Sequence, residues 1–282
     1  MKFIKDFLKG MVIGVANIIP GVSGGTMMVV MGIYDRMIES ISMLRKKFKQ
    51  SALFLLPLLL GAGAGIWLFS SGIAYMLTNH QVITNFFFIG LIVGSIPMVF
   101  QKATESEFKK RNLIPFVITL AVMIATLLIS PVDSTEIIRT LDAVQFIRLT
   151  LFAAFAATAM IIPGISGSFV MMMLGVYGSI VTAVSEFNIP LLIPIGIGVL
   201  IGIVGGAKVI HLMLKRFPQA MYFGILGFVV GSVPAIFPEG FRFDGTGVIA
   251  ILALIIGGAL SYLSSADWVK AYFTRKKAGE EE

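Results

Sequence analysis

Two stretches rich in serine and glycine carry the residues of this sequence best suited to bind an anion. The first runs from Asn17 to Thr26 and the second from Met160 to Phe169, and both contain Pro-Gly-x-Ser-Gly. Each interrupts an apolar segment with residues that an unbroken helix tolerates poorly. If a helix restarts at the serine, its first backbone N–H groups have no helical partner and the positive end of its dipole lies beside them. These residue types therefore favour binding of an anion such as a phosphate or a carboxylate.

The expected binding groups are the backbone amides and hydroxyls at the start of each restarted helix. Glycine lets a ligand approach the backbone closely, and each hydroxyl adds a further donor. The predicted phosphate-binding residues are Ser23, Gly24, Gly25 and Thr26 in the first stretch, and Ser166, Gly167 and Ser168 in the second. The alternative is that these small residues serve only close helix packing. Because the motif occurs twice, binding is the favoured interpretation.

Four further polar residues could contact a charged headgroup, and each has an ordinary alternative role. Asn17 could cap or bind near the first stretch, and Arg36 follows that stretch but could equally be a solvated charge. Arg148 precedes the second stretch, and Lys208 lies in an apolar run from which it can reach the membrane surface. The two histidines show no metal-ligand spacing, so we expect neither a metal nor a cofactor.

The elements that must position these residues are apolar. The 282 residues are 57% hydrophobic and 13% charged, with a mean hydropathy of +0.95. This composition is typical of a polytopic membrane protein and excludes an ordinary soluble domain. The net charge of +7 comes from Lys and Arg residues in short connections, which favours membrane topology over nucleic-acid binding. The absence of cysteine excludes disulfides and thiol chemistry.

The chain contains an internal duplication. Ten positions around the two motifs hold the same residue type at an offset of 143, and further glycines and prolines match downstream at an offset of 137. The pattern predicts one all-α membrane domain over 1–282, built from two repeats that each contain a helical hairpin and three transmembrane helices. The first repeat, 1–131, has its hairpin at about 10–34 and spans at about 52–77, 82–100 and 113–129; the second, 147–265, has its hairpin at about 149–177 and spans at about 189–214, 221–237 and 247–263.

Charge decides whether the two motif segments cross the membrane. If both are re-entrant and the N-terminus is cytoplasmic, nineteen of the twenty-two Lys and Arg residues lie on the cytoplasmic side. If the first motif crossed, the five basic residues from Arg36 to Lys49 would move outside. Each arm of the first hairpin is about 13 Å long at 1.5 Å per residue, roughly half of a bilayer core of about 30 Å. We therefore predict re-entrant hairpins in inverted repeats, with both termini cytoplasmic and an interfacial helix over residues 1–10.

The double Pro-Gly-x-Ser-Gly pattern, above all residues 17–26, resembles the bacterial and archaeal family of polyprenyl-phosphate translocases (PopT), once catalogued only as a domain of unknown function. The resemblance covers roughly residues 7–263. It implies a transporter in the cytoplasmic membrane, whose partner is undecaprenyl phosphate, the lipid carrier of cell-wall sugars, returned from the outer to the inner leaflet. The second copy departs from the first, since Ser168-Phe169 replaces Gly25-Thr26.

Two other functions use similar elements. Undecaprenyl-diphosphate phosphatases carry a Pro-Gly-x-Ser-Arg-Ser type of motif, but glycine stands here where that arginine would be, and no intramembrane glutamate pair accompanies it. Phosphoryl transfer needs such charges around its transition state, so we do not expect an enzyme. A small-anion channel or exchanger is the other alternative. A lateral opening wide enough for an alkyl chain would favour a lipid over an ion.

Overall fold

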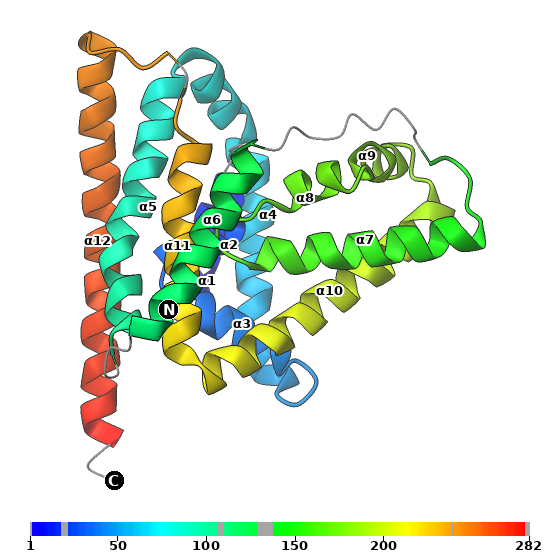
Figure 1. The fold of residues 1–282 in the computed structure, drawn as a ribbon, viewed down its shortest axis with the longest axis horizontal. Coiled ribbons are helices and arrows are strands. Elements are labelled where there is room, and N and C mark those ends of the chain that lie inside the picture. Colours follow the sequence, from blue (N-terminus) through cyan, green and yellow to red (C-terminus); the bar gives the residue numbers. More distant parts are fainter. Residues whose placement is uncertain (1, 18–21, 106–109, 129–137, 239, 280–282) are drawn as a thin grey trace.

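The computed structural model describes residues 2–17, 22–105, 110–128, 138–238 and 240–279, including side chains except those of 2, 168, 169 and 264–279. The described residues form α-helices and one short 3-10 turn, with no strand among them (Figure 1). The helices are α1 (Lys2–Ala16), α2 (Gly24–Val30), α3 (Tyr34–Ser42), α4 (Phe48–Asn79), α5 (Gln81–Ala103), α6 (Leu113–Leu128), α7 (Ala143–Ile161), α8 (Gly167–Met173), α9 (Tyr177–Ser185), α10 (Ile189–Arg216), α11 (Pro218–Ala235) and α12 (Gly245–Gly279), with the turn η1 (Lys110–Asn112) before α6.

Seven described helices are long and apolar enough to cross a membrane. They are α4, α5, α6 with η1, α7, α10, α11 and the first part of α12, Gly245–Leu263. The predicted class, an all-helical polytopic membrane protein, is confirmed by this set of helices. The second-motif segment differs from our expectation in length, because α7 begins at Ala143 rather than near 149. Its start is set by Asp142, whose carboxylate accepts a hydrogen bond of 2.7 Å from the Gln145 backbone N–H.

The first helix is continuous where the sequence suggested two parts. Residues 2–16 form one helix instead of an interfacial helix followed by a separate arm. It packs along α4 at backbone distance: a Cβ atom at Gly10 would lie only 2.1 Å from the Leu58 carbonyl oxygen, and one at Gly14 equally close to that of Ala62. Glycine is therefore required at both positions. The second repeat packs α7 against α10 in the corresponding way.

The remaining long helices pair across the two repeats. Helix α5 packs along α12, α6 packs along α11, and α5 and α11 also contact each other. Figure 1 shows α5 running toward the end of the bundle where α12 ends, whereas its counterpart α11 runs the opposite way. Each repeat thus supplies helices to the packing of the other, so the halves are interlocked.

One end of the bundle, at the bottom of Figure 1, collects the basic connections; we call it the basic end. The α3–α4 connection, the end of α5, the turn η1 and the corner between α10 and α11 lie there. Its described basic residues include Arg45, Lys46, Lys47, Lys49, Lys102, Lys110, Arg111, Lys215 and Arg216. The positive-inside rule predicts that this end faces the cytoplasm.

Candidate functional site: a junction between the two motifs

Both motifs are followed by a helix that begins at the predicted position. Helix α2 begins at Gly24 after Ser23, and α8 begins at Gly167 after Ser166. The Ser23 hydroxyl accepts a hydrogen bond of 3.1 Å from the Thr26 backbone N–H, which caps α2. Ser166 makes no such capping bond. The predicted Pro20-Gly21 turn lies outside the described residues.

The two motifs meet at one backbone group of the second. The Gly164 N–H donates to the Thr26 hydroxyl at 2.7 Å and to the Ser23 hydroxyl at 3.0 Å. The two hydroxyls are also hydrogen-bonded to each other at 2.9 Å. Gly164 has a φ of +86°, a conformation that favours glycine. We call these three residues, with Gly25, the junction; it joins positions about 140 residues apart in the protein interior, since Thr26 is fully buried and Ser23 is 5% exposed.

Gly25 completes the junction by letting the two backbones approach. A Cβ atom at Gly25 would lie 3.0 Å from the Ile161 carbonyl oxygen and 3.1 Å from that of Ile162. At Gly24 the neighbour is instead the flexible Asn17 side chain, whose amide oxygen would lie 2.9 Å from an added Cβ. Asn17 therefore covers the start of α2. Gly167 faces its own repeat, at Met160 and Ala156.

Two of the three charged candidates from the sequence, Arg36 and Arg148, contact aromatic rings, and the third, Lys208, is exposed. The Arg36 guanidinium lies 3.9 Å from the centre of the Phe54 ring and 3.7 Å from the Asp6 carboxylate. Arg148 lies 5.7 Å from the Phe152 ring, and Lys208 is exposed on α10. Their role as headgroup contacts stays a prediction, as does phosphate binding at both motifs.

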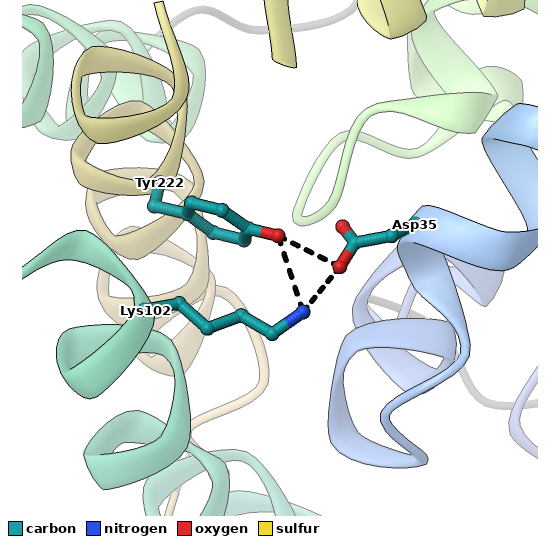
Figure 2. A network of polar contacts seen from close by, with 3 residues as sticks. All are labelled: Asp35, Lys102 and Tyr222. Carbon is teal, nitrogen blue, oxygen red and sulfur yellow. Dashed lines mark hydrogen bonds and ion pairs between the residues drawn. The ribbon is translucent and has the colours of Figure 1, made fainter. Parts of the chain in front are cut away.

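A charged cluster that the sequence analysis missed lies at the basic end (Figure 2). Lys102 of α5 and Tyr222 of α11 both donate to the same oxygen, Oδ2, of Asp35 on α3; the Tyr222 bond measures 2.7 Å. The Lys102 ammonium is also 3.1 Å from the Tyr222 hydroxyl. The predicted span at about 82–100 leaves Lys102 in a connection, but α5 continues through Ala103 and includes it. A lysine within one turn of an apolar helix end was the available signal.

The wall of an apolar cavity of about 760 Å3 includes residues adjacent in sequence to the junction and to the charged cluster, but none of the junction or cluster residues themselves. It lies between α6, α7, α10 and α11. Ile162 and Pro163, next to Gly164, line one part, while Tyr34 and Met221, next to Asp35 and Tyr222, line another. Exposed side chains such as Leu151 and Phe155 belong to its wall, so the cavity opens on the apolar surface of the protein.

A second apolar cavity, of about 490 Å3, occupies the matching place in the first repeat. It is bordered by α1, α2, α4, α5 and α12. At the offset of 143, its α1 residues correspond to those that α7 gives to the larger cavity: Leu8, Met11, Val12 and Val15 match Leu151, Ala154, Phe155 and Thr158. The duplication therefore repeats the apolar cavities as well as the motifs.

The chain is similar to known proteins over most of its length. Residues 13–246 match the family model described as undecaprenyl phosphate translocase-like. A Staphylococcus aureus protein named polyprenyl-phosphate transporter is 34% identical over 243 residues, which cover 83% of this chain and 86% of that protein. A Vibrio cholerae protein of the same name is 28% identical over 253 residues, covering 84% and 79% respectively. No solved structure shows a significant match. By the extent of these matches, the chain belongs to the undecaprenyl phosphate translocase-like family.

Proposed function

We propose that this protein moves a polyprenyl phosphate between the leaflets of the cytoplasmic membrane, and that the phosphate passes the junction between the two motifs. The observation that carries the proposal is the position of the larger cavity, an apolar groove whose wall includes Ile162 and Pro163, the two residues before Gly164 of the buried polar junction. A lipid with one charged headgroup and a long apolar tail needs both environments side by side. The names of the two relatives agree with this substrate class.

The junction offers donors that can be exchanged for an anion. In the present conformation the Ser23 and Thr26 hydroxyls accept from the Gly164 N–H. If that contact opens, both hydroxyls and the released N–H can turn toward a phosphate. Hydrogen bonds to a charged acceptor are stronger than those between neutral groups, so a phosphate would compensate for the contact that it replaces. Binding and opening would thus be coupled.

The larger cavity suits the tail. Its lining is almost wholly apolar, and its opening lets the rest of a prenyl chain remain in the bilayer. An ion or a small hydrophilic anion would gain nothing from such a wall. The cavity therefore favours a lipid substrate over the anion channel or exchanger considered from the sequence.

Transport without hydrolysis is the second part of the proposal. Residues 17–26 and 160–169 contain no charged side chain. Phosphoryl transfer requires charged groups or metal ions around the transferred phosphoryl group. The proposed path is through two re-entrant segments in inverted repeats, with the basic end in the cytoplasm, as the distribution of Lys and Arg predicts.

The test is transport of a fluorescent polyprenyl phosphate between leaflets of vesicles containing the purified protein. Gly205→Phe would fill the larger cavity, because a Cβ atom at Gly205 meets nothing within 4 Å. Gly196→Phe is the matched control: it lies on the same helix, has equally open surroundings and is not part of the cavity wall. We expect Gly205→Phe to slow transport about tenfold or more and Gly196→Phe to leave it unchanged, a difference of at least about 1.4 kcal/mol in the barrier.

Two results would contradict the proposal. Equal transport by the Gly205 and Gly196 variants would show that the lipid does not pass through the larger cavity. Release of inorganic phosphate from polyprenyl diphosphate at rates abolished by Ser23→Ala would assign the protein to the phosphatases.

A further inference from the structure

The charged cluster at the basic end has an uneven arrangement of partners. Two donors from different helices, Lys102 and Tyr222, converge on one oxygen of Asp35, as Figure 2 shows. The other carboxylate oxygen, Oδ1, is buried and has no hydrogen-bond partner among the described residues. A structural ion pair would be expected to satisfy both oxygens of a carboxylate where one is buried. Lys102 and Tyr222 would therefore suit another anionic ligand better than they suit the Asp35 carboxylate, one of whose oxygens they leave without a partner.

The two donors are of the kinds that bind a phosphate. The Lys102 side chain is only 15% exposed, so its ammonium is a poorly hydrated point charge. Its neighbour, the Tyr222 hydroxyl, can donate a second hydrogen bond to the same anion. A phosphate monoester carries more negative charge than a carboxylate and has three terminal acceptor oxygens. It could satisfy both donors with separate oxygens.

The cluster is placed where the headgroup of a bound lipid would arrive. A small cavity of about 10 Å3, with room for about one water molecule, lies beside Asp35, Lys102 and Tyr222. Tyr34 and Ile225 line both this space and the 760 Å3 cavity. A headgroup can enter from the larger cavity only if the Asp35 carboxylate withdraws from Lys102, because the free space is too small for both anions.

We propose that Lys102 and Tyr222 form a second phosphate position at the basic end, and that Asp35 fills it when no phosphate monoester is bound. The ligand class is a phosphate monoester, and its attachment to a polyprenyl chain rests on the proposed function. The lipid headgroup would thus have one position at the junction and another at the end assigned to the cytoplasm. Asp35 acts as an internal competitor at the second position.

The test compares variants that the proposal and a merely structural ion pair would affect differently. Farnesyl phosphate, farnesol and inorganic phosphate serve as probes, with binding to the detergent-solubilised protein measured by calorimetry. We expect Lys102→Gln to weaken farnesyl phosphate binding about tenfold or more, since a hydrogen bond to a charged group is lost. Asp35→Asn should strengthen it several-fold, because the competing carboxylate is gone. Binding of farnesol should not change in either variant.

Matched controls are provided by the next turn of α3. Glu39 pairs with Lys47 at 3.5 Å in an exposed position at the same end of the protein. Glu39→Gln and Lys47→Gln change the same charges without touching the cluster and should leave binding unchanged. Tyr222→Phe, which keeps the ring and removes only the hydroxyl, should weaken binding several-fold even if Lys102→Gln is poorly folded.

The outcomes separate the sources of the phosphate and the two proposals. Binding of inorganic phosphate as tight as that of farnesyl phosphate, with the same variant effects, would keep the site but make a free phosphate its ligand. Weaker binding in both Asp35→Asn and Lys102→Gln, together with equal losses of stability, would show a structural ion pair and overturn the inference. Normal binding in Lys102→Gln and Tyr222→Phe would overturn it as well, even if the wild-type protein transports polyprenyl phosphate. Failure of wild-type transport would instead count against the proposed function.

Discussion

The two motif hairpins share a sequence pattern but differ in how the protein encloses them. Helix α2 of the first hairpin packs against α5 and α7, and α3 packs against α10, so this hairpin contacts both repeats. The main contacts of α8 and α9 are with α7 and α10 of their own repeat. In Figure 1, α8 and α9 lie well to the right of α5 and α12. The first hairpin is thus embedded between the two repeats, whereas α8 and α9 of the second hairpin contact mainly their own repeat.

The charges follow the same division. At the offset of 143, Asp6 corresponds to Leu149, Lys9 to Phe152 and Asp35 to Gly178. The duplication has kept the helix break in both copies, and a basic residue at Lys5 and Arg148, whereas these three charged residues occur only in the first copy. The replacement of Gly25-Thr26 by Ser168-Phe169 is a further difference between the two copies.

The largest expected effect concerns the sides of the membrane on which the two hairpins end. Gln50 and Glu186 are both exposed and lie after the first and the second hairpin, respectively. A single cysteine can be introduced at either position. Inverted repeats predict that an impermeant thiol reagent labels Gln50→Cys only from the cytoplasmic side and Glu186→Cys only from the outside, an all-or-none difference. The chain has no native thiol to interfere. Labelling of both cysteines from the same side would contradict the inverted arrangement of the two repeats.

The next effect concerns backbone approach at the two helix starts. Gly25→Val would push its side chain into the Ile161 and Ile162 carbonyl oxygens of the other repeat, whereas Gly167→Val meets mainly the Met160 side chain of its own. We expect the Gly25 variant to lose transport almost completely, by about a hundredfold or more, with a loss of stability of about 1–3 kcal/mol from overpacking. The Gly167 variant should retain more activity. Vesicle transport and thermal unfolding measure both quantities, and the reverse ranking would contradict an embedded first hairpin.

A smaller effect is expected from single hydroxyls. Thr26→Val keeps the shape of a fully buried side chain but leaves the Gly164 N–H with Ser23 as its remaining partner at the junction. A lost hydrogen bond to a phosphate would lower affinity about tenfold or somewhat more. Ser166→Ala, in the second hairpin, should change affinity less, because the Ser166 side chain makes no capping hydrogen bond at the start of α8. Equal effects of Thr26→Val and Ser166→Ala would indicate that the two motifs have equal roles.

The sequence predicted the features that depend on neighbouring residues better than the features that depend on contacts between distant residues. The helix breaks and restarts at Ser23 and Ser166 depend on proline and glycine within a few residues, so the sequence indicates them directly. The exchange of helices between repeats depends on which apolar faces fit each other, and hydropathy does not encode that choice. The Asp35–Lys102–Tyr222 cluster joins residues 67 and 187 positions apart, and a single sequence contains no sign that they meet.

The smallest expected effect concerns the two arginines near the hairpins. Arg36→Gln removes the cation beside the buried Asp6 carboxylate and above the buried Phe54 ring, so it should lower the free energy of unfolding by about 1–3 kcal/mol. Arg148→Gln loses only a longer contact with Phe152 and should cost about 0.5–1 kcal/mol. Denaturation in detergent and vesicle transport, measured on the same preparations, separate two roles for Arg36. If Arg36→Gln lowers stability, and transport falls only in proportion to the amount of folded protein, then Arg36 supports the embedded hairpin. Loss of transport at unchanged stability would instead favour a role in transport itself, such as contact with the headgroup, because a side chain that serves only the fold should not lower transport without lowering stability.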